Sequence, residues 1–484
     1  MASPYPTRLL WLLLILCPAE AWAEDDSSPS VEVVAPADSL GTMDLASRAR
    51  EPAQAPGLWQ RETLTGDWGG WRSALADNGV ALGAEYTGDV LANVSGGIRR
   101  GAVYAGRLHL AADLDLEKLA GLAGASIHAN AFQIHGRGLS PEFLGNLLAT
   151  SNIEAHPATR LHTLWFQQNG FDGRLSFRAG QLAADDEFII SDTAMTFING
   201  TFAWLPLAAS NLPSGGPGYP LAAPGARIAA MPAEDLTFLT AVFGGDPAGK
   251  PGNEDPQLHN NSGTTFSLEG GVLVMAEIQY ALNHGADSSG LPGTYKIGGW
   301  YHTGAFDDLR RDNLGLSLAD PAGSGVAARH RGNRGIYAVA DQMVYREPGG
   351  EDRGLGLFMR IGGAPLDRNP VDFYLDGGAG YKGPIPGRNA DVLGLAVGYA
   401  HVSGDLQQRD RDARAFSGVA TPVEDHEAVV EITYIARIAP WWTVQPDVQF
   451  LFHPGGNVAH PGDPTGIAAV PDAVVVGLRT VVAF

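Results

Sequence analysis

From Val80 onward, apolar and polar residues alternate with a period of two in segment after segment. In residues 102–116 the apolar series is Tyr104, Leu108, Leu110, Leu114 and Leu116, and the polar series is Arg107, His109, Asp113 and Asp115. Residues 173–180, 264–281 and 441–453 repeat this pattern. Because successive side chains of a β-strand point to opposite faces, each segment predicts a strand with one apolar and one polar face.

Sixteen segments of this kind are predicted along the chain. They span residues 80–93, 102–116, 122–135, 160–168, 173–181, 226–231, 235–244, 264–282, 293–304, 335–346, 354–362, 372–382, 391–402, 426–438, 441–453 and 473–484. The faces of 122–135 and 335–346 are ambiguous, and 226–231 is short. We therefore expect an all-β fold of about sixteen strands.

The connections between these strands are of two kinds. Breaks such as 169–172 and 439–440 are short, whereas 183–225, 305–334 and 403–425 are long. A water-soluble sandwich also alternates, but its connections are more even in length. Short turns at one end and long loops at the other are typical of a transmembrane antiparallel up-and-down β-barrel of the outer membrane. Aromatic residues near segment ends suit its interfacial girdles: Tyr86, Tyr104, Tyr280, Tyr301, Tyr434, Trp441 and Trp442.

The last segment, "AVVVGLRTVVAF", is apolar on both faces except for one arginine. In lipid every backbone donor and acceptor must be paired within the protein, so a membrane sheet has to close on itself. We expect this strand to pair with the first, with Leu478 facing lipid and Arg479 facing a wet lumen. An arginine in the middle of the lipid would cost roughly 2–4 kcal/mol. The terminal Phe484 resembles the signal that the outer-membrane insertion machinery reads.

The residues before the barrel divide into three parts. Residues 1–23 have the features of a secretory signal peptide, with Arg8, the apolar run "LLWLLLILC" and a cleavage site after Ala23. A lipoprotein signal at Cys17 is disfavoured because Leu16 stands where a small residue is needed. Residues 24–58 read as a flexible periplasmic leader. Residues 59–79 predict a short periplasmic helix, with Asp67 as N-cap, Trp68 and Trp71 on one face and Gly79 as its stop.

Charge and composition narrow the functional classes. The formal net charge is −21, which argues against nucleic acid or an anionic surface as the main partner. Removal of residues 1–23 would delete the only cysteine, so the exported chain would form no disulfide. With 53 acidic and 32 basic residues, a pore through this protein is expected to pass small cations more readily than anions.

Several stretches together resemble a known family. They are "LTGDWGGWRSALADNGV" with "NVSGG", "LSFRAGQLAADDEF", "GTYKIGGWYHTGAFDD", "GIYAVADQMVYR", "GYKGPIPGRNAD", "VVEITYIARIAPWWTVQPDVQFLFHPGG" and "VVVGLRTVVAF". In this order, from about Leu64 to Phe484, they are similar to the OprB-like carbohydrate-selective porins of Gram-negative outer membranes. The resemblance implies a sixteen-stranded barrel, usually monomeric, that passes glucose and related sugars by facilitated diffusion. Periodicity alone indicates a pore and no substrate.

A sugar-selective pore needs charged partners for hydroxyl groups and an aromatic surface for the ring, gathered at a constriction. The stretch "RLSFRAGQLAADDEF" offers such groups where a strand becomes a long loop. The candidate eyelet residues are Arg107, His109, Trp165, Arg174, Arg178, Gln181, Asp185, Asp186 and Glu187, with Trp204 as a second aromatic candidate. The alternative is that these charges pair with one another and brace the wall. For Arg388 and Asp391 we expect a mutual ion pair that fixes a loop.

Enzyme and metal motifs fail on inspection. "GGDPAGKP" carries Pro251 where a phosphate-binding loop needs Ser or Thr, and "HEAVV" at His426 lacks the second histidine of a zinc helix. Calcium bound by Asp246, Glu254 and Asp255 is less favoured than a solvated turn. We therefore expect a non-enzymatic sugar porin without a cofactor or metal. The alternatives are a general or cation-preferring diffusion porin and a lipid-hydrolysing barrel enzyme.

Overall fold

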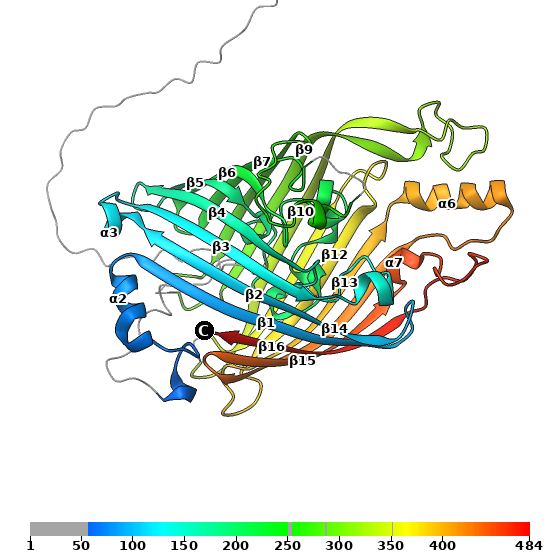
Figure 1. Ribbon diagram of the computed structural model, residues 1–484. Helices are drawn as coiled ribbons and strands as arrows, with labels where there is room; N and C mark the ends of the chain where they lie inside the picture. The colour runs from blue at the N-terminus through cyan, green and yellow to red at the C-terminus, as the bar shows by residue number, and fades with distance from the viewer. Residues whose placement is uncertain (1–56, 250–253, 286–287, 351) are drawn as a thin grey trace, which may run out of the picture. The chain divides into compact units, whose positions relative to one another are not determined.

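The computed structural model of the chain describes residues 57–249, 254–285, 288–350 and 352–484. In these residues sixteen antiparallel strands form one closed barrel (Figure 1). Each strand pairs with its neighbours in sequence, and β1 pairs with β16. The predicted sixteen-stranded antiparallel barrel is therefore confirmed. The expected signal peptide 1–23 and nearly all of the leader 24–58 lie outside the described residues.

The strands are β1 (Val80–Ser95), β2 (Gly101–Asp115), β3 (Ala125–Gly136), β4 (Ala158–Gly170), β5 (Leu175–Leu182), β6 (Ala223–Ala233), β7 (Leu236–Gly244), β8 (Val272–Leu282), β9 (Gly293–Asp312), β10 (Ala327–Arg346), β11 (Gly354–Gly363), β12 (Val371–Lys382), β13 (Val392–Val402), β14 (His426–Ala439), β15 (Trp442–Phe452) and β16 (Ala473–Ala483). The helices are η1 (Leu58–Gln60), η2 (Trp68–Gly70), α2 (Trp71–Asp77), α3 (Leu116–Ala120), η3 (Ser140–Leu144), η4 (Ala184–Asp186), η5 (Ala194–Thr196), η6 (Gly200–Phe202), α4 (Pro206–Ala209), η7 (Pro213–Gly215), α5 (Pro256–His259), α6 (Gly404–Ser417) and α7 (Pro454–Asn457). Among these described helices, none combines the length and apolar character needed to cross a membrane.

Two of the predicted boundaries were wrong. Residues 264–271 are not part of β8, because Gly270 and Gly271 take positive φ angles of 80° and 103° that no regular strand adopts. The expected loop 305–334 is largely a hairpin, in which β9 and β10 each extend to 20 residues and Arg329 lies opposite Asp307. This segment carries charged residues on both faces, so apolar and polar positions do not alternate along it.

The two ends of the barrel differ in their connections. At one end, β4–β5, β6–β7 and β14–β15 are joined by the short turns 171–174, 234–235 and 440–441. The same end carries α2 and the end of the chain (Figure 1). At the other end lie the long connections 137–157, 183–222, 245–271 and 403–425, which contain most of the remaining helices. We call these the turn end and the loop end.

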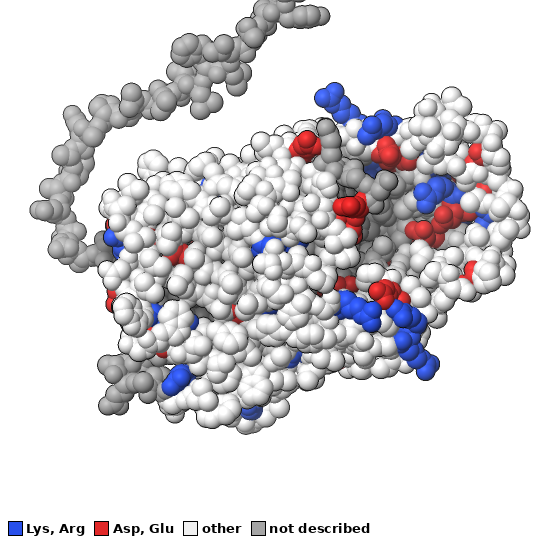
Figure 2. All heavy atoms as spheres, in the orientation of Figure 1, with Lys and Arg blue, Asp and Glu red and all other residues white. Residues whose placement is uncertain are grey.

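The outer face of the wall is apolar. On β13, Leu393, Leu395 and Val397 are exposed, whereas the residues between them, Gly394 and Ala396, face inward. On the face that Figure 2 shows, few charged groups reach the surface of the wall, and most of them gather at the loop end over α6 and the β9–β10 hairpin. A band of this kind matches the hydrocarbon interior of a bilayer.

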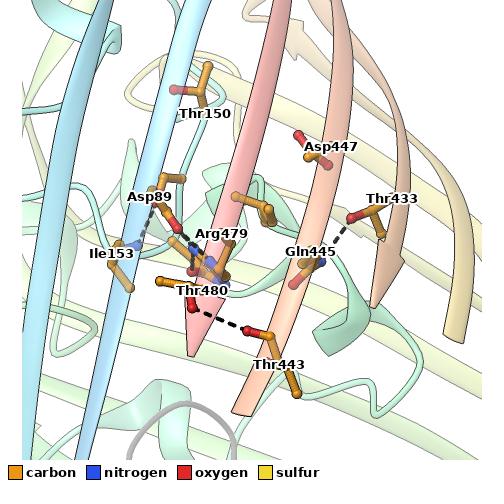
Figure 3. Close-up of polar contacts among 12 residues, drawn as sticks. Asp89, Thr150, Ile153, Thr433, Thr443, Gln445, Asp447, Arg479 and Thr480 are labelled. Carbon is orange, nitrogen blue, oxygen red and sulfur yellow. Dashed lines mark hydrogen bonds and ion pairs between the residues drawn. The ribbon is translucent and has the colours of Figure 1, made fainter. Parts of the chain in front are cut away.

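The seam between the first and last strands is held by an internal ion pair. Arg479 of β16 donates from Nε and Nη2 to the two carboxylate oxygens of Asp89 on β1, at 2.7 and 2.8 Å (Figure 3). Its Nη2 also donates to Asn152 Oδ1 at 2.8 Å. Both charged side chains are buried inside the barrel. The expected inward direction of Arg479 is therefore correct, and its charge is neutralised there.

Residues 57–77 bind the turn end of this seam. Arg72 is buried and donates from Nη2 to the main-chain oxygen of Phe484 at 2.7 Å, and Leu64 N donates to Ala483 O at 2.8 Å. Trp59 stacks on Trp441 with ring centroids 6.0 Å apart. Arg72 and Leu64 therefore contact the end of the last strand, and Trp59 contacts the β14–β15 turn.

The sequence rules applied to this segment were only partly correct. Gly70, not Asp67, stands before α2, and the Asp67 carboxylate accepts from Ser73 N and Oγ at 2.8 Å. Trp71 points outward with 71% of its surface exposed. Gly79 follows the helix with φ of 88°, as expected of a stop.

Candidate permeation site

The connection 183–222 folds into the lumen and narrows it. Its apolar side chains are buried, among them Phe188, Phe197, Phe202 and Leu207, and they belong to one core with inward residues of β10–β16 such as Tyr337, Phe358 and Val429. Phe202 and Phe358 meet edge to face with centroids 6.1 Å apart. We call this connection the inner loop. In the closed barrel, strands β2–β6 lie opposite β10–β14, and we call β2–β6 the opposite wall.

Wall carboxylates hold the inner loop by its backbone. Glu431 of β14 accepts from Ile198 N at 2.6 Å and from Asn199 N at 3.0 Å. Glu277 of β8 accepts from Ile189 N at 2.9 Å, and Asp341 of β10 accepts from Ser191 Oγ at 2.7 Å. Since buried backbone donors need partners, these carboxylates fix the path of a segment that has little regular structure.

One ion pair beneath the inner loop has no exposure at all. Arg360 of β11 and Asp376 of β12 are fully buried, and Arg360 Nε lies 3.1 Å from both Asp376 carboxylate oxygens. Arg360 also donates to the carbonyls of Ile189 at 3.3 Å and Thr201 at 3.1 Å. This pair therefore joins two strands of the wall to two points of the inner loop.

The opposite wall, formed by β2–β6, carries a first group of candidate residues around Arg107. The Arg107 guanidinium carbon lies 5.1 Å from the ring centre of Phe132 and 5.4 Å from that of Tyr219, which belongs to the inner loop. Phe132 also contacts the rings of His109 and His162, at 5.0 and 4.7 Å. Positive charge and aromatic faces therefore alternate across β2, β3 and β4 at this level.

Asp185 adds a carboxyl group to this first group. It accepts from Tyr219 N at 2.7 Å and is buried at the start of the inner loop. Burial raises its pKa to about 6, although the hydrogen bond from Tyr219 and the charge of Arg107 oppose the rise. Burial likewise raises the pKa of Tyr219 to about 12. The acid is therefore poised to change its charge near neutral pH.

A second group of candidate residues surrounds Glu187. Its carboxylate accepts from Arg178 at 2.9 Å and from Arg227 at 2.6 Å. Although burial opposes ionisation, the two guanidinium groups hold the pKa of Glu187 below its usual value. Arg178 also lies 3.7 Å from the ring centre of Trp165, and His128 stacks on the same ring at 4.9 Å. Glu187, Arg178, Arg227, Trp165 and Asp186 line a small recess in the wall.

The remaining candidates have other surroundings. Arg174 is exposed in the turn 171–174, at the turn end, and not beside the inner loop. Gln181 donates to the carbonyls of His162 at 2.7 Å and Gly263 at 2.8 Å, and Trp204 donates to Gly215 O at 2.9 Å. Gln181 and Trp204 therefore hold backbone in place, as the bracing alternative predicts. The expected pair of Arg388 and Asp391 is present at 2.7 Å, in a turn at the turn end.

Several side-chain N–H donors on the opposite wall have no protein acceptor. Within the described part of the chain, Nε and Nη1 of Arg107, Nε and Nη1 of Arg160, and Nε1 of Trp165 are buried without a hydrogen-bond partner. Leaving a buried donor unpaired costs about 1–3 kcal/mol, so such groups are normally satisfied by water or a ligand. Hydroxyl groups of a polyol are suitable acceptors.

Sequence patterns had missed Phe132, Arg160, His162, Tyr219 and Arg227. The pairing of β3 with β4 shifts between Ala129 and Ala131, and both His162 and Thr163 of β4 are buried there, so the inward face of β4 changes from even to odd positions and its alternation is lost. Arg227 stands on a strand whose polar side has few charges, and Tyr219 lies in the inner loop. Only the arginine and aromatic content of these segments could have drawn attention to them.

Comparison with known proteins gives consistent matches. The family model described as "Carbohydrate-selective porin, OprB family" matches residues 99–484. Porin B of Pseudomonas aeruginosa is 27% identical over 483 residues, which cover 94% of this chain and 98% of that protein. The putative porin QuiX of Acinetobacter baylyi is 24% identical, over 91% of this chain and 97% of its own length. The high-pH structure of Pseudomonas putida OprB superposes with a TM-score of 0.77 at 25% identity, and covers 90% of this chain and all of its own.

Proposed function

The chain belongs to the OprB family of carbohydrate-selective porins, so it is a sugar porin, and we propose that glucose-sized sugars cross it between the inner loop and strands β2–β6. As a member of this family it is a channel rather than an enzyme. The finer assignment concerns the residues that meet the sugar. We assign that contact to Arg107, Arg160 and Trp165.

The observation that carries this assignment is the set of unpaired donors beside aromatic rings. Arg107 and Arg160 hold buried N–H groups without an acceptor, and Phe132 and Tyr219 lie beside Arg107. A pyranose ring presents hydroxyl oxygens at its edge and C–H groups on its faces. It therefore fits a wall that alternates guanidinium and aromatic groups, and it would replace the water that those donors otherwise need.

The paired charges of the second group serve a different role in this proposal. Glu187 already binds Arg178 and Arg227, so these three groups hold each other and set the width of the passage. Transport requires binding that is loose enough for release, and a millimolar Kd corresponds to about 4 kcal/mol. Two hydrogen bonds from the unpaired donors of these arginines supply that amount, since a hydrogen bond to a charged group is worth about 1.5–3 kcal/mol.

Single-channel recording with graded glucose tests the assignment. R160Q removes a charged donor and should weaken glucose block of the ion current about tenfold, a loss of about 1.4 kcal/mol. The control R329Q changes an exposed arginine on the β9–β10 hairpin and should leave the block unchanged. Equal block in the wild type, R160Q and R107Q would refute the assignment of these arginines while leaving the family function intact.

Substrate class is tested separately by liposome swelling. A sugar-selective passage should admit glucose faster than amino acids of the same size, whereas a general diffusion porin would admit both equally. We place the protein in the outer membrane of a Gram-negative bacterium, because its family is one of porins and its outer wall is apolar. We further propose that Phe484 serves recognition by the insertion machinery and that the barrel acts as a monomer.

A further inference from the structure

We propose that Asp425, His426 and His453 form a binding site for a divalent transition-metal ion of the zinc class on the outer rim of the loop end. His426 is the first residue of β14, Asp425 precedes it, and His453 follows β15. One ligand atom from each of the three side chains lies within 4.8 Å of the other two. The site is separate from the passage for sugar.

The geometry converges on a single carboxylate oxygen. Asp425 Oδ1 lies 2.9 Å from His453 Nδ1 and 3.3 Å from His426 Nδ1. The two imidazole rings are tilted by 43° with centroids 4.6 Å apart. With bonds of about 2.0–2.1 Å, neighbouring ligands of a tetrahedral zinc ion lie about 3.3 Å apart, which is close to both separations. A cation can therefore take the place of the protons that these groups otherwise share.

The backbone around the three residues is fixed before any ion binds. Asp425 N donates to Gly456 O at 2.9 Å, and His453 N donates to Asp472 Oδ1 at 2.9 Å. His453 has a φ of 51°, in the left-handed region, and two amides of α7 donate to its carbonyl. The ring of His426 stacks on Tyr399 at 5.1 Å. Little freedom remains to be lost on binding, which favours affinity.

The choice of metal follows from the donor set. Two imidazoles with one carboxylate suit Zn²⁺, Ni²⁺ and Cu²⁺, whereas Mg²⁺ and Ca²⁺ prefer oxygen ligands alone. The side chains of His426, Asp425 and His453 are 31%, 39% and 38% exposed, so an ion reaches them from solvent and a water completes its coordination. This partial exposure suits a reversible site.

Strand alternation places the site outside the barrel wall. His426 shares a face of β14 with Ile432, which is exposed on the outer surface. Glu427 and Glu431 are on the opposite face and point inward, where they accept hydrogen bonds from the backbone amides of Leu147 and Ile198. An ion at His426 therefore lies outside the barrel wall, at the loop end, and does not obstruct the pore.

Zinc titration of the whole barrel in detergent, purified without a polyhistidine tag, tests the proposal by calorimetry. We expect one Zn²⁺ per chain in the wild type, and a loss of affinity of about tenfold or more in H426Q and in H453N. Asparagine tolerates the left-handed backbone at position 453. The control H330Q alters another histidine–aspartate contact at the loop end and should bind as the wild type does.

A second readout distinguishes the proposed site from adventitious histidine binding. Cu²⁺ bound to the wild type should give an electron paramagnetic resonance spectrum with coupling to two imidazole nitrogens, and H453N should show one. Zinc should leave the conductance and glucose block unchanged. Wild-type zinc affinity in both H426Q and H453N would overturn the site. A zinc block of the current that H426Q abolishes would overturn its position outside the pore.

Discussion

Replacing Asp376 with asparagine should release the inner loop from the barrel wall. The substitution keeps the shape of the side chain but removes the charge that faces Arg360. Both side chains have no solvent exposure, and Arg360 also binds the carbonyls of Ile189 and Thr201 in the inner loop. The arginine would be left as a buried, uncompensated cation, and it can regain water only if the inner loop lifts away.

The size of the effect follows from the burial of the pair. Removing one partner of a buried ion pair costs about 3–5 kcal/mol. If lifting the inner loop relieves this cost, its opening equilibrium rises by roughly two to nearly four orders of magnitude, at about 1.4 kcal/mol per factor of ten. The amides of Ile198 and Asn199, which donate to Glu431, report that opening directly.

Amide hydrogen exchange of the barrel in detergent is the measurement. The control is D307N, which breaks the ion pair of Asp307 with Arg329 on the exposed hairpin, where the side chains are 70% and 68% exposed. Such a pair is worth about 0–1 kcal/mol, so the exchange of the inner loop should change less than tenfold. Similar exchange at Ile198 in D376N and D307N would refute the idea that the buried pair holds the inner loop.

Three further outcomes are expected. Asp185, with its pKa raised to about 6, is neutral below that pH and charged above it. The cation-to-anion permeability ratio, measured from reversal potentials, should therefore rise between pH 5 and 7. The same rise in D185N would contradict this. Burial raises the pKa of Glu154 from 4.5 to about 7, so the folded chain holds a proton that the unfolded chain releases. Stability should therefore fall as pH rises from 4.5 to 7, by at most about 3 kcal/mol, and urea titration should show a smaller fall in E154Q than in the wild type. R72Q removes the hydrogen bond to the main-chain oxygen of Phe484 and should cost about 1.5–3 kcal/mol of stability at the seam. On gels, the folded band of R72Q should therefore disappear at a lower temperature than that of the wild type. The control K118Q changes an exposed position and should leave this temperature unchanged.

The strands were predictable because burial in a barrel wall imposes a period of two on the sequence. That rule failed where the wall is not between lipid and lumen. Residues 305–312 and 327–334 form strands beyond the apolar band, so charged residues occupy both faces. It also failed at 264–271, where alternation occurs without pairing into the barrel. Periodicity therefore reports the environment of a strand and not the strand itself.

The site was predictable only in part. Arg178, Glu187 and Asp185 stand next to one another in sequence at the entry to the inner loop, so local sequence was enough to select them. Arg174 lies four residues before Arg178 in the sequence, yet it is at the turn end, because it belongs to the turn 171–174 and precedes β5. Tyr219 lies far from Arg107 in the sequence and reaches it only through the folding of the inner loop, which no local pattern encodes.

Ion selectivity depends on where the charges lie, and net charge alone does not determine it. The chain has an excess of acids, but Glu431, Glu277 and Asp341 are buried and bind amide or hydroxyl groups of the inner loop. At the narrowing the balance is close to even: the charged groups there are Arg107, Arg160, Arg178, Arg227, Asp185, Asp186 and Glu187. Since fields focus where the passage is narrow, this local set should govern permeation. E187Q should therefore shift the permeability ratio toward anions, whereas an unchanged ratio would mean that the charges at the mouth of the barrel, and with them the overall net charge, decide which ions pass.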